Sequence, residues 1–117
     1  MEKIVLAAAS FEKEKYFFND QFEKLPESIK KDIKVITVVL ANNLMCTIVM
    51  GFYETGDIYF EAIKREEASD FDDIGAELEI KVLQKEKADF LEKLRLWYLV
   101  YNTKEGKEMK DELLKRD

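Results

Sequence analysis

Apolar residues recur with a helical period in the first third of the chain. After Pro26 they follow one another at spacings of four, three and four residues, at Ile29, Ile33, Ile36 and Leu40. Pro26 at the first helical position and Glu27 in the first turn favour a helix start. The β-branched run Val35–Val39 favours a strand instead, but the helical period begins before it and continues through it. We therefore expect a helix that ends at about Asn42.

Strand-like patterns precede this helix. Residues 3–9 are short and apolar and are closed by Ser10, and Tyr16–Phe18 is an aromatic run with strand preference. The segment between them, Phe11 to Lys15, is polar enough for a turn. These segments predict an N-terminal hairpin.

A second hairpin is predicted between Leu44 and Lys64, with its turn at Glu54–Asp57. A two-residue loop would pair Phe52 with Tyr59 and scatter apolar residues over both faces. A three-residue loop, with Gly56 in the left-handed conformation of a bulge, gathers them on one face. That face carries Cys46, Ile48, Met50, Phe52, Ile58, Phe60 and Ala62. The opposite face carries Thr47, Val49, Tyr53, Tyr59, Glu61 and Ile63, a set too apolar for a plain solvated surface.

A long helical pattern ends the sequence. Ser69 has the chemistry of an N-cap, with Asp72 at the capping-box position, and the pattern runs to about Asn102. Gly75 marks either a break or a close packing contact near its start. The apolar stripe consists of Ile80, Leu83, Phe90, Leu94, Trp97 and Tyr101, widened by Leu91 and Tyr98.

The predicted order is ββαββα, an α+β fold with an antiparallel sheet of about four strands and two main helices packed on one face. We expect a single domain over residues 1–103 and a charged helical tail over residues 104–117.

Composition limits the chemistry. The 117 residues include no histidine, one cysteine and four glycines. Serine and cysteine hydrolase sites that use histidine, zinc sites built on histidine and glycine-rich phosphate loops are therefore excluded. A net charge of −6, with lysines interleaved among acidic residues, argues against nucleic-acid binding. The sequence predicts no membrane span, cofactor or metal, and the lone Cys46 fits a reducing cytoplasm.

One acidic run is a candidate cation site. Its oxygen ligands suit calcium or magnesium, but its spacing lacks the pattern of an EF-hand, so helix capping in a solvated loop is the better interpretation. The run consists of Glu66, Glu67, Asp70, Asp72 and Asp73.

Two hypotheses for function follow from the apolar residues. Surplus apolar area on one sheet face and on the last helix predicts a homodimer that acts as a protein-interaction module. Its interface residues would be Val49, Tyr53, Tyr59, Ile63 and Tyr98. The alternative is a small-molecule-binding domain or enzyme with a pocket between sheet and helices. That pocket would be lined by Phe18, Phe52, Trp97 and Tyr101.

Four segments resemble a family of short, uncharacterised proteins of Gram-positive bacteria. They are Lys15-Tyr16-Phe17-Phe18-Asn19, Leu25-Pro26-Glu27-Ser28-Ile29-Lys30, Asp73-Ile74-Gly75 and Ile80-Lys81…Gln84…Lys87. The resemblance spans roughly residues 4–101. It implies no activity, cofactor or catalytic residue.

Overall fold

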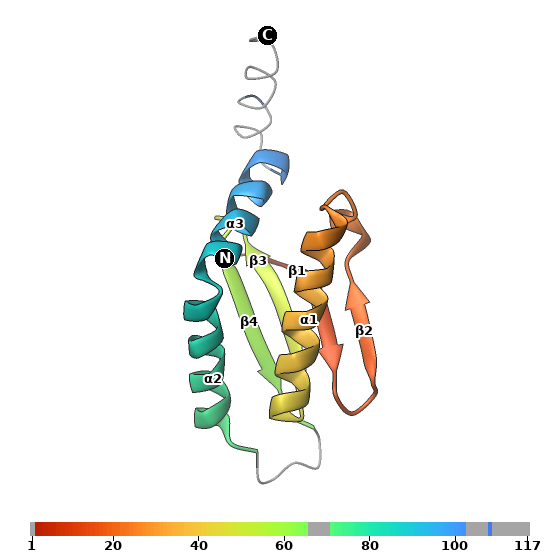
Figure 1. Cartoon of the computed structure of the whole chain (residues 1–117), viewed down its shortest axis with the longest axis vertical. Helices are drawn as coiled ribbons and strands as arrows, with labels where there is room; N and C mark the ends of the chain where they lie inside the picture. Colours follow the sequence, from red (N-terminus) through yellow and green to blue (C-terminus); the bar gives the residue numbers. More distant parts are fainter. Residues whose placement is uncertain (1, 66–70, 103–107, 109–117) are drawn as a thin grey trace.

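The computed structural model describes residues 2–65, 71–102 and 108 (Figure 1). Within these residues four strands form one antiparallel sheet in the order β2-β1-β3-β4. The strands are β1 (Lys3–Ser10), β2 (Lys15–Phe18), β3 (Thr47–Tyr53) and β4 (Ile58–Ile63). The helices are the short 3-10 turn η1 (Asp20–Phe22), α1 (Glu27–Leu44), α2 (Asp73–Glu86) and α3 (Ala88–Asn102). The predicted α+β fold is confirmed.

The β3–β4 hairpin has the register that the side-chain pattern favours. Phe52 pairs with Ile58, and the pairs Met50–Phe60 and Ile48–Ala62 follow. The three-residue loop places Gly56 at a φ of +88°, where a residue with a Cβ would be strained. Arg95 of α3 donates from Nε to Oδ1 of Asp57 at 3.2 Å, which ties this turn to the last helix.

The N-terminal hairpin is also confirmed, and it contains a β-bulge that the sequence did not predict. Val5 pairs with Gly51 but Ala7 pairs with Met50, so Leu6 is the extra residue of β1. Asn19 holds this bulge: its Nδ2 donates to the Val5 carbonyl at 2.7 Å, and its backbone N–H donates to the Leu6 carbonyl at 2.9 Å. As a result both Leu6 and Ala7 are buried.

Helix α1 remains helical through its β-branched run. Pro26 precedes the first helical residue, Glu27, instead of occupying the first helical position, and the helix ends at Leu44. Met45 then adopts the left-handed conformation, with φ 51°, and the next N–H, that of Cys46, reaches back to the Ala41 carbonyl at 3.1 Å. This is a Schellman ending in which methionine occupies the position usual for glycine.

The long C-terminal helix is interrupted, but not at Gly75. The interruption lies at Lys87, which ends α2 with φ −104° and ψ 20° and directly precedes α3. Gly75 lies in the first turn of α2, where its N–H donates to Oδ1 of Asp72 at 2.8 Å. Asp72 is therefore the N-cap, and Asp73 is the first helical residue. The predicted cap Ser69 lies outside the described residues.

All three α-helices cover the same face of the sheet (Figure 1). Ile33 of α1 and Leu94 of α3 join Met50 and Phe52 in one core cluster. The second cluster contains Ile48 of β3 and Cys46, the residue that precedes β3. Leu40 of α1 belongs to this cluster, and Ile80 of α2 packs against it. The other face of the sheet carries no helix among the described residues. The tail predicted over residues 104–117 lies outside the described part of the chain except for residue 108.

Candidate functional site

The helix-free face of the sheet is a continuous surface of side chains from all four strands. Cross-strand pairing sets them in four rows. The rows are Lys15–Ser10–Thr47–Ile63, then Phe17–Ala8–Val49–Glu61, then Val5–Gly51–Tyr59, and finally Lys3–Tyr53. Apolar residues occupy the middle of this surface, and charged residues lie toward its edges.

Several of these apolar side chains are left to solvent. Phe17 is 54% exposed, Ile63 48% and Val5 36%, whereas Val49 between them is half-buried. These residues come from β1, β2, β3 and β4, so the apolar area runs across the whole sheet. An apolar patch that spans several elements is the usual mark of an interaction surface.

A tyrosine pair occupies one end of the face. The rings of Tyr53 and Tyr59 are 5.3 Å apart, and Nζ of Lys3 lies 5.0 Å from the Tyr59 ring centroid. Tyr59 is only 8% exposed because its ring lies over Gly51, the residue opposite it in β3. Burial, the Glu61 carboxylate and Tyr53 all raise the pKa of Tyr59. The hydroxyl is therefore protonated at neutral pH and available as a donor.

The structure brings four of the five predicted interface residues onto this face: Val49, Tyr53, Tyr59 and Ile63. The fifth, Tyr98, lies in the helical layer, where its ring stacks on Phe52 at 4.5 Å. It cannot contribute to the same surface.

Ring contacts link three of the four residues of the alternative pocket, Phe52, Trp97 and Tyr101, by way of Phe22, and Tyr101 is 39% exposed. Phe52 is fully buried, and its ring centroid is 5.4 Å from that of Phe22 and 4.5 Å from that of Tyr98. Phe22 also meets Trp97, at 6.2 Å, and Trp97 stacks on Tyr101 at 4.9 Å. Phe18 is half-buried beside the same core cluster. Phe22, which the sequence did not single out, fills the space next to Phe52.

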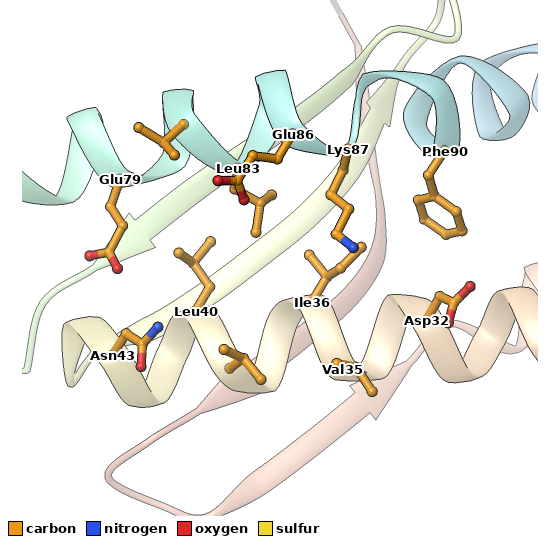
Figure 2. A pocket seen from close by; sticks show the side chains of 12 residues that line it. Asp32, Val35, Ile36, Leu40, Asn43, Glu79, Leu83, Glu86, Lys87 and Phe90 are labelled. Atoms are coloured by element: carbon orange, nitrogen blue, oxygen red, sulfur yellow. The ribbon is translucent and has the colours of Figure 1, made fainter.

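A groove between α1 and α2 is a second surface feature (Figure 2). Its volume is about 590 Å³, and Ile36 and Leu40 of α1 point toward Leu83 of α2 across it (Figure 2). Val35 and Val39 of α1 and Val82 of α2 also line it, and each is about half exposed. Three carboxylates border it against one ammonium group: Asp32, Glu79 and Glu86 against Lys87. An apolar floor with an acidic margin fits an amphipathic helix that carries basic residues beside its apolar ones. The sequence did not predict this groove.

A third feature is a cavity of about 980 Å³ toward the C-terminal end of α1. It lies between the β1–β2 turn, the second half of α1 and Arg65, which follows β4. Tyr16 lies in it, with Nζ of Lys34 at 5.5 Å from the ring centroid. Burial raises the pKa of the Tyr16 hydroxyl, which is therefore a donor at neutral pH.

Residues 2–65, 71–102 and 108 contain no group of three or more potential metal ligands of the Cys, Asp or Glu type. In the same residues no helix is long and apolar enough to cross a membrane.

Residues 3–106 match the model of a protein family, described as a family of unknown function, DUF6145. The chain belongs to the DUF6145 family. No curated protein and no solved structure was found to match it.

The DUF6145 match runs from β1 past the end of α3, so it includes the helix-free face, the groove and the cavity alike. The segment Lys15–Asn19 carried part of the resemblance. It contributes Phe17 to the helix-free face and Tyr16 to the cavity. Its last residue, Asn19, holds the bulge of β1. Tyr16, Phe17 and Asn19 of this DUF6145 protein therefore each have a structural role besides their preference for a strand.

Cys46 gives this DUF6145 protein a pH-dependent stability. It is fully buried, and burial raises the pKa of its thiol from 9.0 to about 11. Between these values the unfolded chain loses the thiol proton while the folded protein keeps it, so the free energy of unfolding falls as pH rises. The expected loss is on the order of 2 kcal/mol.

Urea unfolding of wild type and Cys46→Ala at about pH 8 and about pH 11 measures this loss. The variant should lose less stability between the two values than wild type, whatever its starting stability. Equal losses in the two proteins would show that the thiol is not protected by burial.

Proposed function

We propose that the protein is a non-catalytic interaction module of the bacterial cytoplasm and that it acts as a homodimer through the helix-free face of its sheet. The observation that carries the proposal is the apolar middle of this face, with Phe17, Ile63 and Val5 exposed. A second copy of the same face would cover it, and twofold dimers are the commonest assembly of soluble proteins. Two sheets packed in this way form a sandwich whose inner side chains interdigitate.

Charges at the edges of the face support one geometry for this dimer. Lys15 lies on β2 at one edge of the sheet, and Glu61 lies on β4 at the other. A twofold axis parallel to the strands places β2 of one copy over β4 of its partner. This axis keeps each row opposite the same row of the second copy, so Lys15 would lie one row away from the partner's Glu61. Two such charge pairs would flank the apolar centre, where they favour one register more than they add affinity.

The chemistry of the chain supports a non-catalytic role. The sequence has no histidine, and its one cysteine is buried and protonated at neutral pH. A reactive cysteine needs exposure and a lowered pKa, and Cys46 has neither. A buried free thiol and the resemblance to proteins of Gram-positive bacteria support the cytoplasm as its location.

A dimer through the sheet would leave the groove between α1 and α2 open, because that groove lies in the helical layer. This is the surface that we propose for a protein partner. The alternative of a ligand pocket at Phe18, Phe52, Trp97 and Tyr101 has less support, since the rings of Phe22 and Tyr98 both pack against Phe52.

The mass in solution tests the dimer. Light scattering on a sizing column at tens of micromolar should give twice the chain mass of 13.8 kDa. Ile63→Lys should give a single-chain mass, because it places a charge within the apolar face. The matched control is Leu78→Lys, an equally drastic change on α2 at a side chain that is 58% exposed, and it should remain dimeric. A wild-type monomer, or a dimer that survives Ile63→Lys, would refute the proposal.

Charge reversal tests the geometry. Lys15→Glu or Glu61→Lys alone should weaken the dimer, because each variant would bring like charges together across the interface. The double reversal should restore the affinity lost by either. If the double variant is weaker than both single variants, the two residues do not meet across a twofold axis parallel to the strands.

A further inference from the structure

The groove between α1 and α2 exposes apolar side chains that helix formation does not require. Val35, Val39 and Val82 line it and are 52%, 49% and 55% exposed. Valine is a weaker helix former than leucine, glutamine or lysine, because its branched Cβ restricts χ1, so a solvated helix position gives no reason for it. Leu78 lies one turn before Val82 on the same side of α2 and is 58% exposed. Four large apolar side chains are therefore left to solvent along these two helices.

The charged residues of the groove leave it acidic. Three carboxylates line it, those of Asp32, Glu79 and Glu86, against the single ammonium group of Lys87. None of these four side chains forms an ion pair with another residue in the described part of the chain. The negative charge of the groove is therefore not neutralised by the residues that the structure describes, and it is available to a partner.

The carboxylates lie at the ends of the groove and the apolar residues lie between them. Figure 2 shows Asp32 at one end and, at the other, Glu79 pointing toward Asn43. Asp32 and Asn43 are eleven residues apart on α1, which is about 16 Å along the helix axis. The floor between these ends consists of Ile36, Leu40 and Leu83.

The walls of the groove favour a helix as its occupant. Both walls are α-helices, whose backbone N–H and C=O groups are hydrogen-bonded along the helix, so an extended segment would find no backbone partners there. A helix satisfies its own backbone and presents apolar side chains every three or four residues, which can pack between those of α1 and α2.

We propose that this groove binds one amphipathic helix of a partner protein, with two basic residues about eleven positions apart and apolar residues between them on the same face. Eleven positions span about 16 Å of helix, so the two basic side chains would reach Asp32 and Glu79. Residues about four and seven positions after the first basic residue lie on the same face and would contact the valines. The inference rests on the proposed interaction role and names the chemistry of the partner.

Fluorescence anisotropy with a labelled synthetic peptide tests the groove. The probe is a helix of about 18 residues with lysines at i and i+11, leucines at i+4 and i+7, and alanine and glutamine elsewhere. Binding should saturate, and the methyl NMR signals of Val39 and Val82 should shift. A control peptide of the same composition, with both lysines moved to the opposite face of the helix, should bind about fivefold more weakly. Equal affinities for the two peptides would overturn the proposed placement of the basic residues.

Variants at exposed positions test the apolar contacts without disturbing the core. Val39→Gln combined with Val82→Gln should weaken peptide binding about tenfold. The matched control is Leu96→Gln on α3, where the side chain is 51% exposed, and it should bind as wild type does. The proposal is overturned if the peptide does not saturate the protein, or if the double variant binds it as tightly as wild type.

A second pair of variants tests the charges. Asp32→Asn combined with Glu79→Gln should remove the preference for the first peptide over its control, because both acidic ends are gone. Glu12→Gln combined with Glu23→Gln removes the same charge from exposed positions outside the groove and should keep that preference. Loss of the preference in both double variants would show that net charge, not the groove, attracts the peptide.

Two other occupants are outcomes of the same experiments. If the Val39→Gln, Val82→Gln variant changes the mass in solution, the groove is an interface between copies. If Leu113→Asp combined with Leu114→Asp strengthens peptide binding about tenfold, the segment 103–117 of this chain competes for the groove. Either result overturns the proposal. A dimer that does not bind the peptide would refute this inference alone, and a monomer that binds it would refute the dimer alone.

Discussion

Gly51→Ala is expected to lower the free energy of unfolding by about 2–3 kcal/mol, although alanine is ordinarily the better residue inside a strand. A Cβ at this position would lie 2.6 Å from Cε1 of Tyr59 and would press on the Ile4 carbonyl oxygen. Neither neighbour can move easily: the carbonyl belongs to β1, a central strand of the sheet, and Tyr59 is only 8% exposed. Urea unfolding followed by the fluorescence of the single tryptophan, Trp97, measures the change.

A double-mutant cycle apportions this cost. Tyr59→Ala removes the ring that lies over Gly51, so the double variant should be more stable than the sum of the two single effects predicts. Part of the cost should remain, because the Ile4 carbonyl is still in place. If Gly51→Ala proves as stable as wild type, the ring does not lie over the glycine and the tyrosine end of the helix-free face is arranged differently.

The two hairpins and α1 could be predicted because their signals are local. A strict alternation of side chains fixes the register between β3 and β4, and Gly56 supplies the conformation that the turn needs. The bulge in β1 left no such signal. Residues 7 to 9 are all alanine, so a shift of one residue changes which of them is buried without changing the pattern.

The break at Lys87 was missed for a related reason. It falls in a polar stretch, residues 84–87, between Leu83 and Phe90, where no apolar residue shows how the helix is oriented. The same ambiguity placed Tyr98 with the interface residues. A stripe that is three residues wide on a helix does not specify which member faces the core, and in the structure Tyr98 is the one that stacks on Phe52.

The sites differ in how far the sequence could predict them. Four residues of the helix-free face follow from alternation within one hairpin. The cavity joins Tyr16 to Arg65, and the groove joins α1 to α2, so both depend on how distant segments pack. No local pattern reports such a juxtaposition, because each residue on its own has an ordinary explanation: Tyr16 as a strand residue, Arg65 as part of a charged loop.

Leu94→Ala is expected to lower the free energy of unfolding by about 3 kcal/mol, whereas Leu96→Ala should change it by less than about 0.5 kcal/mol. The two leucines lie two residues apart on α3, and Leu94 is 2% exposed where Leu96 is 51% exposed. The substitution and its helix propensity are the same at both sites, so the difference reports burial alone.

This pair of variants also distinguishes the two descriptions of the space between α3 and the sheet. Leu94 belongs to the core cluster that contains Phe22 and Phe52. In a filled core, truncation of the Leu94 side chain leaves a cavity and loses all of its packing contacts. Beside an open ligand pocket, Leu94 would have fewer packing contacts to lose. Similar small losses in both variants would reopen the case for a pocket at Phe18, Phe52, Trp97 and Tyr101. A large loss confined to Leu94→Ala would support a filled core there, and the helix-free face, the groove and the cavity at Tyr16 would remain the candidate surfaces in the part of the chain that the structure describes.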